Sequence, residues 1–302
     1  MAENSLRGWF GRDDIFATRS RLLKRTVLWL AILVIVLLAG VAYGAIRRER
    51  WYRNAPEGRR QGLLEQLQPV ALANCELKRF GEPNDGGYLM CANLLTDVQT
   101  AYSYGISGYD GWGCDVSRQL KVKVHEYDCF NVQEPVCEGG ALVFHPECVA
   151  GNRSKDSDGR LFDTPESQMA RNDDAKRHLV VKMDVEGAEW ETFLSMSDST
   201  LDQIDQLAVE FHGANGAQFK DAIEKLKRKF YIANLHFNNY SCARSVWPFP
   251  AWAYEVLFVS KRIGVVDRSK PAAFSPLNAP NKTDAYDCQS ITWVPLLRTL
   301  TH

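Results

Sequence analysis

The 302-residue sequence predicts an α/β domain with a mainly parallel sheet and helices on both faces, preceded by a single transmembrane helix. Short apolar runs alternate with polar or amphipathic stretches, which is typical of α/β proteins. A glycine-rich turn follows the first of the apolar runs taken as sheet strands, and an uncharged run of 21 residues precedes the whole domain. Hydrophobic residues make up 45% and charged residues 24% of the chain, so composition excludes a disordered or polytopic membrane protein.

The uncharged run, Thr26–Ile46, is predicted to cross a membrane once. At about 1.5 Å per residue it spans roughly 30 Å, the thickness of a bilayer hydrocarbon core. A cleaved signal peptide has a shorter apolar region of about 7–15 residues, so we predict an uncleaved signal-anchor. Residues 1–25 then form a basic cytoplasmic tail, and residues 26–46 form the anchor.

The side of the membrane is predicted from cysteines, because basic residues do not decide it. Five Lys or Arg lie in the 15 residues before the span and six in the 15 after it. An even set of cysteines on one side indicates disulfide bonds in an oxidising space, the alternative being free thiols in a cytosolic body. All eight follow the span, as do three N-glycosylation triplets at Asn152, Asn239 and Asn281: Cys75, Cys91, Cys114, Cys129, Cys137, Cys148, Cys242 and Cys288.

These features predict a disulfide-bonded glycoprotein of the Golgi or another secretory-pathway membrane, with a lumenal catalytic domain. No C-x-x-C pair is present, which argues against a zinc ribbon, and we assign no residue to a metal. Eight cysteines allow 105 pairings, of which Cys75–Cys91 is the one we expect. Oligomeric state is not predicted.

Charge divides the chain into two unlike parts. Residues 1–60 carry 12 basic and 5 acidic residues, a net charge of +7, and the remainder carries 24 and 32, a net charge of −8. The acidic body makes nucleic acid the least expected partner. We predict a stem at 47–74 with a short helix over Glu57–Gln68, a domain at 75–260, and a C-terminal extension at 261–302.

Seven apolar runs of the domain are predicted as strands. Helices are expected over Ala217–Phe230 and after Gly187, because apolar residues recur there at helical spacing. A further helix is expected over Asp115–Leu120, after the glycine-rich turn. The strands are Ala101–Tyr104, Val122–Tyr127, Ala141–His145, Leu179–Met183, Gln206–Phe211, Tyr231–Phe237 and Tyr254–Ser260.

The glycine-rich segment after the first strand is a candidate cofactor loop. It contains Gly105, Ile106 and Gly108, followed by Gly111 and Gly113. Such a turn in an open parallel sheet lets a ligand approach the backbone closely. Glycines also simply make turns, and the G-x-G-x-x-G dinucleotide fingerprint is absent, which argues against NAD.

Asp128 follows the second strand and is a candidate ligand for ribose hydroxyls. A carboxylate at this place accepts hydrogen bonds from both hydroxyls of an adenosine-bearing cofactor. Glu126 competes for this role but lies inside the strand, and either acid could instead be an ordinary surface residue.

The segment LVVKMDVEGAEW, Leu179–Trp190, carries the most chemistry. A strand ends at Asp184, and Glu186 and Glu189 flank the start of a helix. Strand ends of this kind bind ligands in open α/β sheets. The three acids could hold a cofactor amino group, orient a substrate hydroxyl or collect a metal. Alternatively, Glu186 and Glu189 are first-turn acids favoured by the helix dipole.

These motifs resemble the FkbM-type group of S-adenosylmethionine-dependent methyltransferases, and most closely its membrane-anchored methyltransferase-like branch. The resemblance covers about residues 75–260 and departs from the group in the longer glycine loop. It implies a Rossmann-like seven-stranded methyltransferase sheet with a final antiparallel strand. It rests on VVKMDVEGAEW, YSYGI and VHEYD, with RFG, NDGGY, MC, VEFH, HFNNY and YEV around them.

The predicted function is therefore S-adenosylmethionine-dependent O-methylation of a hydroxyl compound, such as a glycan. Transfer to a hydroxyl needs a base, for which His212 is the first candidate and His236 the second, with Asp184 and Glu210 orienting. The cofactor residues are Gly105, Ile106, Gly108, Asp128, Asp184 and Glu186. The alternatives are a single-pass glycosyltransferase and a non-catalytic ectodomain. Asp156-Ser157-Asp158 has the form of a glycosyltransferase D-x-D metal site, but the polar composition around it favours a solvated turn.

Overall fold

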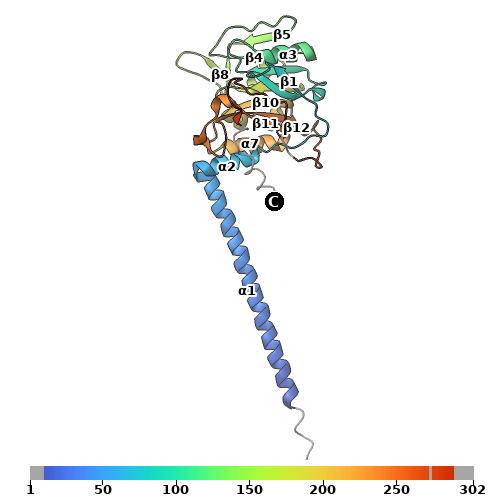
Figure 1. Cartoon of the computed structure of the whole chain (residues 1–302), viewed down its shortest axis with the longest axis vertical. Coiled ribbons are helices and arrows are strands. Elements are labelled where there is room, and N and C mark those ends of the chain that lie inside the picture. Colours follow the sequence, from blue (N-terminus) through green and yellow to red (C-terminus); the bar gives the residue numbers. More distant parts are fainter. Residues whose placement is uncertain (1–9, 272–273, 289–302) are drawn as a thin grey trace, which may run out of the picture. The chain divides into compact units, whose positions relative to one another are not determined.

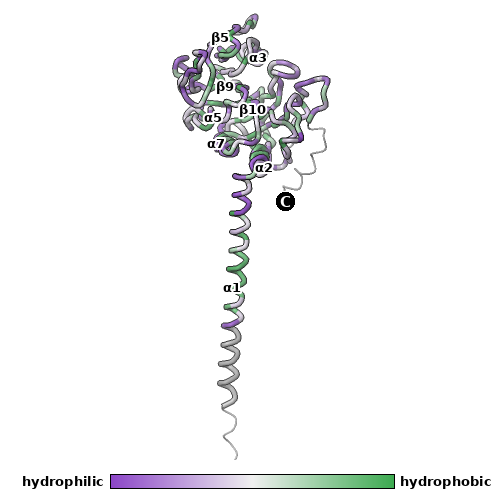
Figure 2. Tube along the Cα trace, turned by 90° about the vertical axis from the view of Figure 1, so that its left-hand side faces the viewer, coloured by the Kyte–Doolittle hydropathy of each residue, from purple (hydrophilic) through white to green (hydrophobic). Residues whose placement is uncertain are grey.

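The structure is a computed structural model that describes residues 10–271 and 274–288 (Figure 1). The chain divides into two units, one ending at Arg53 and the other starting at Asn54. The first contains all but the last residue of helix α1, Phe10–Asn54, whose segment Lys24–Trp51 is long and apolar enough to cross a membrane. The apolar side chains of the segment Lys24–Trp51 are exposed, and apolar residues colour the middle of the helix (Figure 2). An exposed apolar surface of this extent fits lipid rather than water, and the predicted span lies inside this segment.

The second unit is built on a mixed sheet of seven strands, all of which were predicted. Their order is β11-β12-β10-β9-β3-β4-β5, and only β12 runs antiparallel to its neighbours. This agrees with the Rossmann-like sheet and antiparallel final strand that the resemblance implies. The strands are β3 Thr100–Tyr104, β4 Lys123–Tyr127, β5 Ala141–His145, β9 Leu179–Met183, β10 Ile204–His212, β11 Phe230–Phe237 and β12 Ala253–Ser260.

Different elements cover the two faces of this sheet, because successive side chains of a strand point to opposite sides. Leu179, Val181 and Met183 of β9 pack in a core with residues of α2 (Pro56–Gln66), α4 (Pro165–Arg171), α5 (Glu189–Ser195) and α7 (Phe219–Lys229). Val180 lies in the opposite core with residues of α3 (Gly111–Leu120) and of the β1–β2 hairpin (Leu77–Gly81 and Gly87–Cys91). The remaining elements are α6 (Asp198–Leu201), η1 (Ala92–Leu94), η2 (Asn239–Ser241), η3 (Arg244–Val246) and a small sheet of β6 (Cys148–Val149), β7 (Ser154–Lys155) and β8 (Leu161–Asp163).

Two boundaries differ from the sequence prediction. Helix α2 lies within the predicted stem, but Leu63, Leu64 and Leu67 are buried in the domain core. Helix α3 begins at Gly111 rather than Asp115, because the Asp110 side chain caps it by accepting a hydrogen bond from Gly113 N. The glycine loop is therefore shorter than the sequence indicated.

Four disulfides join the described cysteines, and the expected Cys75–Cys91 bridge is among them. The bridge Cys242–Cys288 ties residues 274–288 of the C-terminal extension to the domain. Cys129–Cys148 joins the segment after β4 to β6, and Cys114–Cys137 joins α3 to the loop before β5. A set of paired cysteines fits an oxidising compartment.

Candidate active site

A cleft of about 300 Å³ opens where β3, β4 and β9 end. Four of the predicted cofactor residues line it, and Ile106 and Gly108 do not. A volume of this size suits a small ligand, and the carboxyl ends of parallel strands are where such sheets bind ligands. Its lining consists of Gly105, Ser107, Tyr127, Asp128, Phe130, Cys148, Val149, Phe162, Asp184, Val185, Glu186 and Ala188.

Asp128 organises the glycine loop at one end of the cleft. Its Oδ2 accepts hydrogen bonds from the backbone N–H groups of Ile106 (3.2 Å) and Ser107 (2.8 Å). Its Oδ1 accepts from those of Phe130 (2.8 Å) and Asn131 (3.0 Å). One carboxylate thus holds the two loops that form this wall, and its role toward ribose stays a prediction.

The loop also needs Gly105. Its φ is +76°, and a Cβ atom there would lie 1.7 Å from the Asp184 carbonyl oxygen. No other residue fits so close a contact. Gly105 therefore sets the approach of the β3 loop to the end of β9.

Glu126, the competing acid, is buried away from the cleft. Neither of its carboxyl oxygens has a hydrogen-bond partner among the described residues, and its pKa is raised to about 9 by burial and by nearby Asp110. A neutral, enclosed carboxyl group is unsuited to a ribose. Of the two acids, only Asp128 lies where a ligand can reach it.

Asp184 and Glu186 line the other end of the cleft, and His212, Glu189 and Glu210 lie beside these two acids without lining the cleft. His212 Nδ1 lies 3.0 Å from Glu189 Oε1, and His212 Nε2 lies 3.5 Å from Glu186 Oε2. The same Nε2 is 3.9 Å from Asp184 Oδ1 and 3.9 Å from Glu210 Oε1. The structure thus brings together three of the four predicted catalytic residues, adds Glu186 from the cofactor set, and adds Glu189.

The charge of His212 follows from these neighbours. Burial lowers its pKa, but the hydrogen bond and charge of Glu189, with the charges of Glu210 and Asp184, raise it to about 9. In this arrangement the imidazole is cationic at neutral pH. Only the neutral form of His212 can accept a proton, so the predicted role as a base requires that the ring first loses its own proton.

The fourth predicted catalytic residue, His236, lies elsewhere. It is fully buried, with Nδ1 3.3 Å from Glu255 Oε2 and Nε2 3.7 Å from Asp287 Oδ2. Glu255 faces Glu210 across the β10–β12 pair. His236 thus ends a polar row that starts at the cleft, without lining the cleft itself.

Sequence reasoning missed two residues that fix Asp184. Tyr88 from the β1–β2 hairpin donates its hydroxyl to Asp184 Oδ2 (3.1 Å), and Lys182 Nζ lies 3.5 Å from the same oxygen. Lys182 also donates to the Gly105 carbonyl at 2.5 Å, so it links the strand end to the glycine loop. A lone lysine inside an apolar strand was the available signal, whereas nothing in the sequence placed Tyr88 over this sheet.

No known protein family matches this chain, and no characterised protein matches it at a significant level. Among solved structures, a similar chain is the fibrillarin pre-rRNA processing protein of Methanococcus jannaschii. The identity is 11% and the TM-score 0.33, over 69% of this chain and 77% of that chain. A likeness at this level carries no argument about function, so the motif resemblance to FkbM-type enzymes stays a prediction.

Proposed function

We propose that this protein is an S-adenosylmethionine-dependent methyltransferase that methylates a hydroxyl group in the lumen of the secretory pathway. The observation that carries the proposal is the cleft itself. It opens at the strand ends of a seven-stranded sheet, with the glycine loop and Asp128 at one end and with Asp184 and Glu186, next to His212, at the other. The first end supplies a shaped wall for a nucleoside, and the second supplies groups that can handle an acceptor proton.

The aromatic side chains of the cleft support a nucleoside ligand. Phe130 and Phe162 line the cleft, with ring centroids 6.3 Å apart, and Phe130 is 69% exposed. An exposed ring beside a nucleotide-sized cleft offers a surface for base stacking. In this proposal Asp128, two residues before Phe130, shapes the wall beside which the attached ribose would lie. The amino-acid part of the methyl donor would then extend toward the end of the cleft that Asp184 and Glu186 line.

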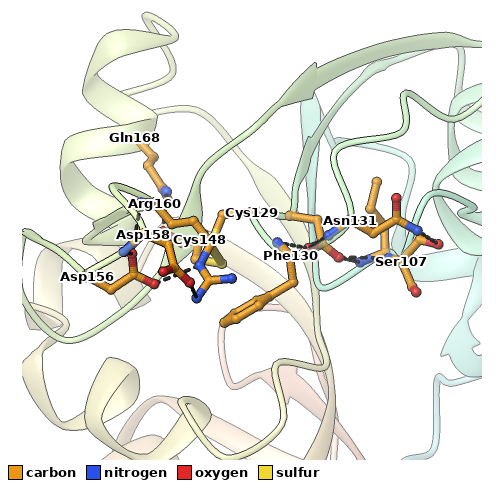
Figure 3. Close-up of a disulfide and its surroundings, with 11 residues drawn as sticks. Ser107, Cys129, Phe130, Asn131, Cys148, Asp156, Asp158, Arg160 and Gln168 are labelled. Carbon is orange, nitrogen blue, oxygen red and sulfur yellow. Dashed lines mark hydrogen bonds and ion pairs between the residues drawn. A yellow bond between two sulfur atoms is a disulfide. The ribbon is translucent and has the colours of Figure 1, made fainter.

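The two acids that favoured the glycosyltransferase alternative, Asp156 and Asp158, are paired with an arginine. Arg160 lies 2.7 Å from Asp156 Oδ2 and 2.7 Å from Asp158 Oδ2 (Figure 3). Asp156 Oδ1 also accepts from the backbone N–H groups of Asp158 and Arg160, which makes a closed turn. Because one arginine pairs with both carboxylates, we do not propose them as a metal-binding D-x-D site.

Thermal unfolding of the full chain in detergent tests the proposal. Ligands that bind the native state raise its unfolding temperature. We expect S-adenosylmethionine to stabilise the protein, and UDP-sugars with Mn²⁺ to do no more than Mn²⁺ alone. Stabilisation by a nucleotide sugar alone would support a glycosyltransferase, and no response to any ligand would support a non-catalytic ectodomain.

Glycan mapping tests the proposed lumenal side. Asn152 is exposed, whereas Asn239 and Asn281 are 5% and 4% exposed, and their side-chain amides donate hydrogen bonds inside the domain. A lumenal domain should therefore carry one glycan, at Asn152. The variant N152Q should then migrate like enzymatically deglycosylated protein. An unglycosylated wild-type chain in secretory membranes would count against the lumenal assignment.

A further inference from the structure

Asp184 and Glu186 of the cleft, together with the neighbouring His212, have the form of a metal centre. A carboxylate oxygen of Asp184, one of Glu186 and a ring nitrogen of His212 lie within 4.8 Å of one another. The Nε2-to-oxygen distances of 3.5 and 3.9 Å are too long for hydrogen bonds. They suit ligands that share one ion, since two ligands at about 2.1 Å from a metal lie roughly 3–4 Å apart.

The orientation of His212 is an independent sign of a ligand. Its side chain is only 9% exposed, and Nε2 has no hydrogen bond to any residue that the structure describes. Nδ1 is held by Glu189, whose side chain is fully buried and whose Oε1 also accepts from Val185 N. A carboxylate that fixes one imidazole nitrogen and aims the other is the usual outer-sphere arrangement of histidine ligands. Here Nε2 is aimed at three carboxylates.

The two carboxylate oxygens of Asp184 have different neighbours, and one of them is left to face His212. Tyr88 and Lys182 both approach Oδ2, while Oδ1 is the oxygen nearest to His212 Nε2. Lys182 therefore neutralises one side of the carboxylate and leaves the other open. Glu210 Oε1, 3.9 Å from the same Nε2, accepts from Asn238 and adds a further negative charge.

We propose that Asp184, Glu186 and His212 bind a divalent transition-metal ion such as Mn²⁺ or Zn²⁺, with Glu210 beside it. The imidazole favours these ions over Mg²⁺ and Ca²⁺, which prefer oxygen ligands alone. On binding, the ion takes the place of the Nε2 proton, which leaves to solvent. Asp184 and Glu186 also line the cleft, so the ion lies next to the proposed cofactor space.

The consequence for catalysis rests on the proposed function. A hydroxyl acceptor bound to the ion loses its proton to solvent more readily. Its oxygen then forms the new bond to the methyl carbon as the carbon–sulfur bond breaks, and the sulfonium leaves as a neutral thioether. His212 acts in this reaction as a ligand instead of the base that the sequence suggested.

Metal binding to the full chain in detergent tests the site without any cofactor. Protein carrying a tag without histidine is stripped with EDTA, dialysed and titrated calorimetrically with MnCl₂ or ZnCl₂. We expect one ion per chain, and a loss of at least tenfold in affinity in E186Q and H212Q. E186Q is informative because the Glu186 side chain is 81% exposed, so its change has little effect on folding. E189Q should weaken binding about 10- to 100-fold by freeing the imidazole.

The matched control is H178Q. His178 Nδ1 lies 3.1 Å from Asp205 Oδ2, so it is also a histidine beside a carboxylate, but it is outside the cleft. H178Q should bind the ion like the wild type. Wild-type binding that survives both E186Q and H212Q, or no binding by the wild type, would overturn the metal site. Binding of S-adenosylmethionine is measured separately in EDTA, so failure of the methyltransferase proposal is distinguishable from failure of this one.

Discussion

The two ends of the cleft hold their acids in opposite ways. The Asp128 carboxylate accepts four backbone hydrogen bonds and keeps two loops in one shape. At the other end Asp184, Glu186 and Glu210 all face His212 Nε2 at 3.5–3.9 Å, with no hydrogen bond to it. The acid at the first end therefore fixes the shape of the backbone, and the acids at the second end concentrate negative charge around one imidazole. Under the proposed function, the first end recognises the cofactor and the second carries out the reaction.

Replacing His212 tests whether the reaction takes place at the Asp184 and Glu186 end of the cleft. We expect H212A to lower methyl transfer by about 10²- to 10⁴-fold, whether the imidazole acts as base or as metal ligand. S-adenosylhomocysteine release, measured with a panel of hydroxyl acceptors, reports the loss. Full turnover by H212A would show that the reaction does not take place at this end of the cleft.

Substitutions of Asp128, which follows β4, and of Glu126, which lies within β4, test the role of the glycine-loop end of the cleft. D128N replaces two acceptor oxygens by one and should lower the free energy of unfolding by about 2–4 kcal/mol while abolishing stabilisation by S-adenosylmethionine. E126Q changes a carboxyl group that burial already keeps neutral, so we expect a loss below about 1 kcal/mol and unchanged cofactor binding. Chemical denaturation with and without cofactor measures both. Equal effects of the two variants would contradict the assigned role of Asp128.

Titration of His236 should make the stability of the domain depend on pH, because this buried ring lies beside Glu255 and Asp287. Burial lowers the pKa of His236, but Asp287 and Glu255 raise it to about 9, above the value near 6.5 of an unfolded chain. Its stabilising contribution, about 2–3 kcal/mol, is complete below pH 6.5 and is lost as pH rises through 9.

The variant H236Q separates this contribution from the rest of the domain. The difference in unfolding free energy between wild type and H236Q should be largest at pH 6 and should shrink toward pH 9.5. A difference that does not change over this range would show that the His236 ion pairs contribute nothing to stability.

Removing the Tyr88 hydroxyl should lower stability and turnover only slightly. Y88F removes only the hydroxyl that donates to Asp184 Oδ2, so we expect a cost of about 1 kcal/mol in stability and a several-fold loss of turnover. Steady-state kinetics and thermal unfolding measure the two changes. A Y88F enzyme identical to the wild type would mean that the hairpin does not position Asp184.

The sequence was sufficient for the sheet because its strands are short apolar runs bounded by polar residues. It also placed Asp128 and Asp184 correctly, since each follows such a run directly. The contacts between the ends of β9 and β10 were not predictable, because they depend on strand order. Glu189 faces His212 only because β10 lies beside β9.

The covering elements were harder to predict for a similar reason. Tyr88 reaches Asp184 because the β1–β2 hairpin packs on one face of the sheet, and no local pattern encodes that packing. Helix α2 has an ordinary polar composition, and only its contact with the core shows that it belongs to the domain. The Cys75–Cys91 bridge could be predicted because the two cysteines bracket one short motif, whereas Cys242 and Cys288 do not.

The most direct test of the division of the cleft is the calorimetric affinity of the full chain for S-adenosylmethionine in three forms, wild type, D128N and H212A. We predict that the wild type binds, that D128N loses binding, and that H212A binds within about threefold of the wild type. Binding retained by D128N and lost by H212A would reverse the roles of the two ends and contradict this account.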